Sequence, residues 1–329
     1  MKKTTVEGIA KKLNVSVSMV SRVLRHCSGV DSEMRLRILE EAGDLPLRDF
    51  GECPVYVILP DTPRYFWGEM RRGVFETLHA EGLRFKDNLC TKVHDEAAIL
   101  NYLEEAVRLD SHVLLLAVRT TPAIRNRLQE LVPDRFVLFL SEYSDLANTF
   151  YCGADPFEEG YRIGREFVSR DMDRRLIVFS LPDRANYEER LAGFLKAVSD
   201  EDPEVARSAV NVPLSRKILS NFKLIPSAIA PLLEKAARYA DRIAVYSPSG
   251  IPGLPLAFSK TRLTEKAVLY CQDCSVKDFE TLPIVSLDQD CYLQGETAAL
   301  LAADFLKHSQ FPSEKKTFIP SRIHFYPEN

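Results

Sequence analysis

Short apolar runs alternate with helical segments along most of the chain, from Pro54 onward. The apolar runs are VYVILP, HVLLLAV, RFVLFL, RLIVFSL, RIAVYS and AVLYCQ. Segments with helical periodicity lie at about 67–81, 122–131, 157–170, 187–199 and 227–240. Strands that alternate with helices form parallel sheets covered by helices. Two such sets of strands occur in the chain, so we expect two α/β lobes with a cleft between them.

The residues that follow the predicted strands are the candidate ligand contacts, because ligands of open α/β sheets bind beyond the carboxyl ends of the strands. They comprise aromatic, arginine and carboxylate side chains: Phe66, Trp67, Arg119, Asp155, Arg190 and Asp273. Such a set suits a polyhydroxylated ligand, since rings stack on sugar C–H faces while Arg and Asp bond hydroxyls. Structural alternatives are lobe packing for Trp67, helix capping for Asp155, a surface ion pair for Arg190 and a solvated loop position for Arg119.

The first fifty residues have a different pattern, which predicts three short helices. The first helix has an apolar stripe formed by Val6, Ile9, Ala10 and Leu13, with a capping box from Thr4 and Glu7. Ser16 caps a second helix that runs to about Arg25. A third helix follows Asp31, with apolar residues at Met34, Ile38 and Ala42. Three short helices with a tight turn between the first two predict a helix-turn-helix.

The second helix has one face for packing and another for contact with a partner. Val20, Val23 and Leu24 share the packing face, while the other face carries Val17, Ser18, Ser21, Arg22 and Arg25. In helix-turn-helix proteins this helix lies in the major groove of DNA. An arginine such as Arg22 can make two hydrogen bonds to guanine, valine can pack on a thymine methyl, and serine hydroxyls can bond phosphate or base.

Charge is distributed unevenly along the chain. The whole chain carries a formal net charge of −4, whereas residues 1–26 contain six basic residues and the single acid Glu7, a net charge of +5. A basic end on an acidic body is typical of a segment that binds phosphate groups. The alternative is a solvated basic helix face.

Several classes of protein are disfavoured by the sequence. The seven scattered cysteines fit reduced thiols, and the CxxC pair Cys271 and Cys274 has no second pair or HxxxH motif to complete a zinc site. We find no P-loop, G-x-S-x-G, HExxH or Gly-rich dinucleotide turn, so we expect neither an enzyme nor a cofactor. The chain has neither an apolar run of about 18 residues nor a signal peptide, which predicts a cytoplasmic protein without membrane contact.

The segments TTVEGIAKKLNVSVSMVSRVLRH and GVDSEMRLRILEEAG resemble the DNA-binding head of the lactose-repressor (LacI/GalR) family. This resemblance implies that Val17, Ser18 and Arg22 read bases, while Thr5, Ser16 and Ser21 hold phosphates. It also implies a helix-turn-helix domain at 1–46, a linker at 47–54 and a two-lobed, periplasmic-binding-protein-like effector and dimerisation domain at 55–329. The implied partner is double-stranded DNA with a near-palindromic operator, bound by a homodimer.

The rest of the chain resembles the family's effector domain more weakly. VILPDTPRYFWGEMRRGV places Phe66 and Trp67, GADPFEEGYRIGREFV places Asp155, ERLAGFLKAV places Arg190, and LYCQDC places Asp273. SLDQDCYLQGETAALLAADFL resembles the late cross-over helix with its glycine, Gly295.

Two departures from the family pattern stand out. The N-x-x-A-R-x-L hinge is missing, because LRDFGEC leads from Pro46 almost directly to the first strand. Pro248 and Ser249 replace the usual Asn-Asp pair, so one expected contact to a sugar hydroxyl is absent.

The prediction is a transcriptional regulator, favoured as a repressor, that is controlled by a small-molecule, carbohydrate-related effector. The alternative is a regulator with a degenerate cleft that responds to a protein partner, which the missing Asn-Asp pair favours. A periplasmic sugar-binding protein shares the fold, but the basic head and the absence of a signal peptide disfavour that interpretation.

Overall fold

The computed structural model describes residues 6–24, 34, 37–38, 41, 53–61, 64–90, 95–142, 144–181, 185–215, 224–251, 254–273 and 283–326. By its internal contacts the chain divides into a first unit, Met1–Gly153 with Cys291–Thr317, and a second unit, Ala154–Asp290 with Phe318–Asn329. The chain therefore passes between the two units three times. The sequence prediction ends the first lobe with the strand RFVLFL, whereas the first unit also contains residues 291–317.

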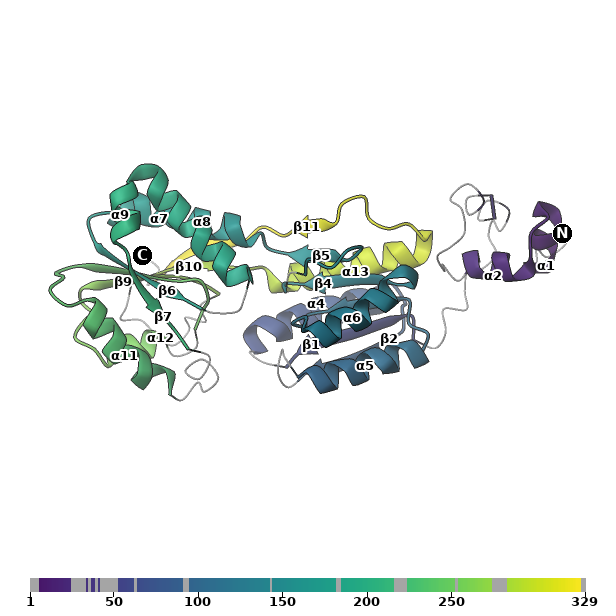
Figure 1. Ribbon diagram of the computed structural model, residues 1–329, viewed down its shortest axis with the longest axis horizontal. Coiled ribbons are helices and arrows are strands. Elements are labelled where there is room, and N and C mark those ends of the chain that lie inside the picture. Colours follow the sequence, from purple (N-terminus) through teal and green to yellow (C-terminus); the bar gives the residue numbers. More distant parts are fainter. Residues whose placement is uncertain are drawn as a thin grey trace. The chain divides into compact units, whose positions relative to one another are not determined.

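The first unit contains a six-stranded sheet with helices on both faces (Figure 1). Its strands, in the order β11-β5-β4-β3-β1-β2, are Lys316–Phe318, Phe150–Gly153, Phe136–Leu140, Val113–Leu116, Val55–Pro60 and Phe85–Cys90. The pairs from β5 to β2 are parallel. Helices α5 (Glu96–Arg108) and α6 (Pro122–Leu131) cover one face, on which Tyr56 and Ile58 of β1 are fully buried.

The other face of this sheet is covered by α4 (Arg64–Ala80) and α13 (Cys291–His308). These two helices touch backbone to backbone. A Cβ on Gly73 would lie 2.2 Å from the Tyr292 carbonyl oxygen, and one on Gly295 would lie 2.0 Å from the Met70 carbonyl oxygen. Only glycine fits at either position, so Gly295 holds a distant segment of the chain against the first unit.

The second unit repeats this architecture with a second six-stranded sheet (Figure 1). Its strands, in the order β12-β10-β9-β8-β6-β7, are Arg322–Tyr326, Ile284–Asp288, Ala267–Gln272, Ile243–Ser247, Arg175–Ser180 and Val210–Pro213. Only β12 is antiparallel to its neighbour. Successive residues of the central strands face opposite sides, so Val178 lies in the core under α7 and Ile177 in the core over α11.

Helices cover both faces of the second sheet as well. One face is packed by α7 (Pro156–Asp171) and α8 (Ala185–Glu201), with the short α9 (Pro203–Ser208) next to α8. The opposite face is packed by α11 (Ile225–Ala236) and α12 (Leu254–Ser259). The predicted strands and helices of both lobes are present, with boundaries that differ by a few residues.

The N-terminal segment forms α1 (Val6–Leu13) and α2 (Val17–Leu24), as its apolar spacing predicts. Ile9 and Ala10 of α1 pack in one small core with Val20 and Val23 of α2 and with Ile38. Ser16 caps α2, because its hydroxyl oxygen accepts a hydrogen bond from the Met19 backbone N–H at 3.0 Å. Thr4, Thr5, Arg25, Asp31 and Ala42 lie outside the residues that the structure describes.

Candidate functional site

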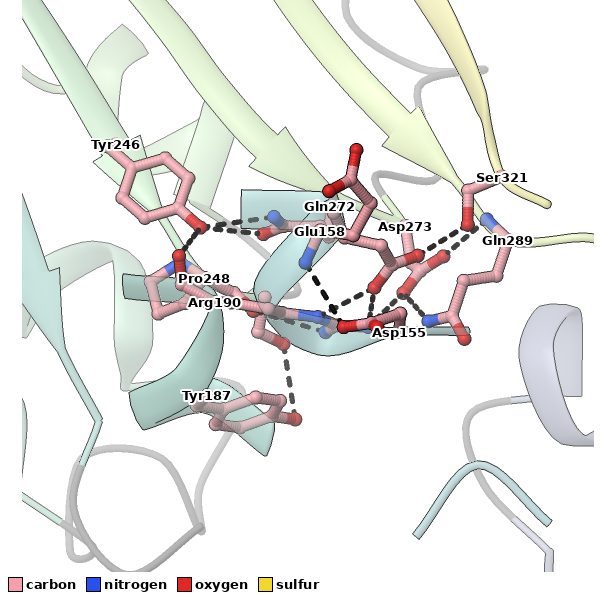
Figure 2. A network of polar contacts seen from close by, with 12 residues as sticks. Asp155, Glu158, Tyr187, Arg190, Tyr246, Pro248, Gln272, Asp273, Gln289 and Ser321 are labelled. Carbon is pink, nitrogen blue, oxygen red and sulfur yellow. Dashed lines mark hydrogen bonds and ion pairs between the residues drawn. The ribbon is translucent and has the colours of Figure 1, made fainter. Parts of the chain in front are cut away.

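A buried polar cluster surrounds Arg190 in the second unit (Figure 2). Arg190 lies on α8 and is 5% exposed, and its main partner, Glu159 of α7, is 3% exposed. Arg190 Nε and Nη2 both donate to Glu159 Oε2, at 2.9 and 2.7 Å. Arg190 Nη1 donates to the Pro248 carbonyl oxygen at 3.2 Å. Three of the five guanidinium N–H groups are therefore engaged within the protein.

Close contact between α7 and α8 brings this pair together. A Cβ on Gly160 would lie 1.9 Å from the Arg190 carbonyl oxygen, and a Cβ on Gly193 would lie 2.1 Å from the Phe157 carbonyl oxygen. Any larger residue at these two positions would push the helices apart. Because Glu159 immediately precedes Gly160, the close approach places its carboxylate against the guanidinium.

Asp273 approaches the same guanidinium from the carboxyl end of β9, with its Oδ2 4.0 Å from Arg190 Nη2. Its backbone has a φ of 51°, in the left-handed region that Asp tolerates better than most residues. Gln289 fixes the carboxylate, since its backbone N–H donates to Oδ1 at 2.9 Å and its Nε2 donates to Oδ2 at 2.7 Å. Asp273 is thus held between the ends of β9 and β10.

Further hydrogen bonds fix the edges of the cluster (Figure 2). The Ser321 hydroxyl donates to Glu159 Oε1. The Tyr246 hydroxyl donates to the Arg190 carbonyl oxygen at 3.2 Å, and the Gln272 amide lies within 3.0 Å of the same hydroxyl. The Tyr246 ring stacks on Phe194, with centroids 3.8 Å apart. The guanidinium and both carboxylates are therefore held in fixed positions.

Two buried carboxylates face one guanidinium, and this arrangement shifts the pKa of all three groups. Burial raises the pKa of Glu159 and of Asp273, while the charge of Arg190 opposes the shift in both. Burial also disfavours the charge of Arg190, but the two carboxylates outweigh this effect and raise the pKa of the guanidinium. The cluster is rich in hydrogen-bond acceptors and its charged donor is largely engaged.

The structure brings together two of the predicted effector residues, Arg190 and Asp273. Asp155 caps α7, because its carboxylate accepts from the Glu158 backbone N–H at 3.1 Å. The carboxylate that contacts Arg190 belongs instead to Glu159, which the sequence analysis did not single out. One signal was available: Glu159 shares the buried stripe of α7 with Ile163 and Phe167 at four-residue steps, and a charged residue in such a stripe needs a partner.

The other predicted effector residues lie in the first unit. Trp67 is 7% exposed, and its ring meets that of Phe66 edge-on with centroids 4.8 Å apart. Trp67 is therefore buried, while Phe66 is half-buried. Arg119 is half-buried after β3. An effector contact for these residues stays a prediction.

An apolar pocket of about 430 Å³ adjoins the Arg190 cluster at the carboxyl ends of β6 and β7. Five apolar or aromatic residues line most of it: Leu181, Tyr187, Leu191, Pro213 and Leu214. The remaining lining residues are polar: Ser180, Glu188 and Ser215. The Tyr187 ring lies 5.9 Å from Arg190 Cζ, and its hydroxyl accepts from the Ser249 hydroxyl at 3.3 Å. Tyr187 thus joins the pocket to the polar cluster.

The predicted DNA contacts are described only in part. Val17, the first residue of α2, is 47% exposed, and Ser16 is exposed at the cap. Ser18, Ser21 and Arg22 lie in α2, but their side chains are outside the described set, as is all of Thr5. Their roles therefore stay predictions.

Neither a metal centre nor a membrane span is found in the part of the chain that the structure describes. Among these residues, no group of three His, Cys, Asp or Glu side chains could hold a metal ion. Cys271 is buried, and Cys274 falls outside the described ranges. Within the same ranges, no helix has the length and apolar character needed to cross a membrane.

Comparison with known proteins gives one curated relative, and no family model matches the chain. The relative is the HTH-type transcriptional regulator DegA of Bacillus subtilis, which is 18% identical over 220 residues. The match covers 63% of this chain and 64% of DegA, so it spans somewhat less than two thirds of the relative.

Solved structures match the two-lobed α/β fold at low sequence identity. GanP, a glucose-galactose binding protein from Geobacillus stearothermophilus, has a TM-score of 0.69 at 13% identity, covering 83% of this chain and 97% of GanP. A LacI family transcriptional regulator from Enterococcus faecium with bound ribose has a TM-score of 0.63 at 19% identity, covering 82% of this chain and 96% of that chain. The predicted periplasmic-binding-protein-like fold with parallel sheets is confirmed. The chain resembles the LacI/GalR family of transcriptional regulators in the sequence of its head and in its fold. Its curated relative is also a transcriptional regulator.

Proposed function

We propose that this chain is a sequence-specific DNA-binding transcriptional regulator whose two-lobed domain binds a small-molecule effector. The observation that carries the proposal is the orientation of α2. Val20 and Val23 are fully buried, whereas Val17 at the start of the same helix is 47% exposed. The first turn of the second helix is where helix-turn-helix proteins contact base edges, and an exposed valine suits a thymine methyl group.

Charge supports the same assignment. Residues 1–26 carry +5 and the whole chain carries −4, so the remaining residues carry −9. Basic residues that displace counterions from DNA phosphates supply most of the non-specific affinity. An acidic body repels DNA, so the head is the part of the chain that would face the duplex.

The Arg190 cluster supports an effector site in the second unit. It lies at the carboxyl ends of β9 and β10, where ligands bind to open α/β sheets. Its carboxylate oxygens can accept hydrogen bonds from hydroxyl groups, and an apolar pocket adjoins it. One structural neighbour is a glucose-galactose binding protein and another binds ribose. We therefore propose a carbohydrate-related effector.

The proposed mechanism is thermodynamic linkage between the effector and DNA. A ligand that prefers one conformation of the two-lobed domain shifts the population toward it, and DNA affinity changes if the heads prefer the other. We propose a homodimer, since a near-palindromic operator presents two equivalent half-sites. We also propose repression, because a protein seated on an operator excludes others from the same DNA.

Capture of genomic fragments tests the DNA-binding part of the proposal. The purified chain is mixed with sheared DNA of its own source, and the retained fragments are sequenced at two salt concentrations. An enriched near-palindrome supports the proposal, and its half-site spacing reports how the heads are held by so short a linker. Retention that is salt-sensitive and independent of sequence would contradict it.

A further inference from the structure

We infer that the second unit binds a neutral or cationic molecule that has an apolar part, and that it excludes anions such as sugar phosphates. This inference rests on the proposed effector function and specifies its ligand. Three observations carry it: the charge of the Arg190 cluster, the engagement of its donors, and the lining of the adjoining pocket.

The charge of the cluster opposes an incoming anion. Arg190 faces two carboxylates, those of Glu159 and Asp273, both within 4.0 Å of its Nη2 atom. When all three groups are ionised, the cluster carries one negative charge in a site screened only weakly by water. Coulomb repulsion between like charges is several times stronger in such a site than in bulk water.

The guanidinium N–H groups of one donor fork, which could bind a phosphate or carboxylate, already donate to Glu159. Arginine recognises these groups through two parallel N–H donors. In this structure the Nε and Nη2 fork is directed at Glu159 Oε2, and Nη1 donates to the Pro248 carbonyl oxygen. An anionic ligand that took this fork would have to displace Glu159, which lies 3% exposed and would lose its charged partner. The two remaining N–H groups lie on Nη1 and Nη2, and the Asp273 carboxylate, 4.0 Å from Nη2, repels an anion that approaches them.

Acceptors, by contrast, remain available to a ligand that donates hydrogen bonds. Each Asp273 oxygen accepts one bond from Gln289, and a carboxylate oxygen can accept two. Hydroxyl groups and ammonium groups supply such donors, so polyols and amines suit the cluster.

The pocket specifies the rest of the ligand. Leu181, Leu191, Pro213 and Leu214 line an open pocket of about 430 Å³ together with Tyr187, whose ring also lies 5.9 Å from Arg190 Cζ. Glu188 is the charged residue among those that line it. A pocket of this size holds a phenyl or short alkyl group. The geometry therefore suits a hydroxylated or amine-bearing group joined to an apolar substituent, as in an aryl glycoside.

Matched ligands separate the two parts of the inference. Isothermal titration of the full chain compares glucose, galactose and ribose with their phenyl glycosides and with their phosphate esters. For the sugar that fits, we expect the phenyl glycoside to bind about tenfold more tightly than the parent sugar, and the phosphate to bind more weakly. Equal affinity of phenyl glycoside and parent, tighter binding of a phosphate, or no binding across the panel overturns the inference.

Two variants test the stated causes. Leu191→Ala, at a half-buried leucine of the pocket, should weaken the phenyl glycoside several-fold and the parent sugar far less. Asp273→Asn removes one negative charge beside Arg190 and should raise affinity for the phosphate, whereas Glu234→Gln, exposed on α11 of the same unit, should not. If Asp273→Asn, with an unchanged circular dichroism spectrum, gains no phosphate affinity, the electrostatic cause is wrong. Genomic capture without ligand reports on the regulator function separately, so failure of one proposal is not mistaken for failure of the other.

Discussion

Replacement of Arg190 by methionine should destabilise the second unit strongly at neutral pH. Methionine fills most of the space of the arginine stem, so the main loss is the positive charge. Glu159 and Asp273 would then remain in the core without the guanidinium that lies 2.7 and 4.0 Å from their nearest oxygens. Removal of one partner from a buried ion pair costs about 3–5 kcal/mol, because the remaining charge is left uncompensated.

The cost should depend on pH with a definite sign. In the native chain, burial raises the pKa of Glu159 and Asp273, and Arg190 opposes that shift. In the variant this opposition is lost, so both pKa values rise further in the folded state. When the pKa of a carboxyl group is higher in the folded state than in the unfolded state, the folded state binds the proton more tightly. The resulting stability is fully present below the pKa of the unfolded state and is lost as pH rises through the pKa of the folded state. The gap between native and variant chains should therefore be largest near about pH 8 and smallest near about pH 5.

Urea unfolding followed by circular dichroism at both pH values measures this effect. Lys196→Met provides the control, since Lys196 lies on the same helix in an exposed pair with Asp200 and its loss should not change the unfolding midpoint. Addition of Glu159→Gln to Arg190→Met should recover part of the stability at the higher pH, because one unpaired charge is removed. A loss of equal size at both pH values would refute the reasoning and point to packing instead of charge.

Two further predictions concern the head and the helix contact. Arg22→Ala should lower specific DNA affinity by about 1–3 kcal/mol, whereas Arg37→Ala, an exposed position in the same head, should weaken binding to all sequences alike, as measured by titration at fixed salt. Gly160→Ala should cost at least about 1–3 kcal/mol in unfolding free energy, because its Cβ would lie 1.9 Å from the Arg190 carbonyl oxygen, while Ser169→Ala, exposed on the same helix, should be tolerated.

The strands that could be predicted from sequence are those buried on both faces. β1, β4 and β9 are buried along their whole length, and they read as continuous apolar runs. The strands β2, β5, β7, β10, β11 and β12 were missed. β5 and β10 are buried but short, and polar or small residues interrupt their sequences FYCG and IVSLD. The other four lie at sheet edges and are only partly buried. The sequences of β2 and β7, FKDNLC and VNVP, accordingly show neither an apolar run nor clean alternation. Edge strands lose the burial signal on which such a prediction depends.

Two of the predicted effector residues lie together in the structure, and each was singled out by a position after a central strand or by a short sequence motif. Asp273 directly follows β9, and Arg190 lies in the segment ERLAGFLKAV, whose glycine, Gly193, allows α8 to touch α7. Glu159 was missed because its contact depends on two helices approaching at glycines, and that approach depends on distant parts of the chain. Asp155 was chosen in its place because it precedes a helix after a strand, a position that also suits a capping residue.

The Pro248–Ser249 segment shows how the cluster tolerates the loss of the expected Asn-Asp pair. The Pro248 carbonyl oxygen accepts from Arg190 Nη1, and the Ser249 hydroxyl donates to the Tyr187 hydroxyl. A backbone acceptor therefore orients the guanidinium at this position, and a backbone atom adds no negative charge to a cluster that already holds two carboxylates. A third carboxylate here would raise the electrostatic cost of the buried cluster. The geometry of Arg190 is thus preserved without the side-chain contact that the family resemblance implies, and this agrees with our proposal that the ligand is recognised by Asp273 and by the apolar pocket.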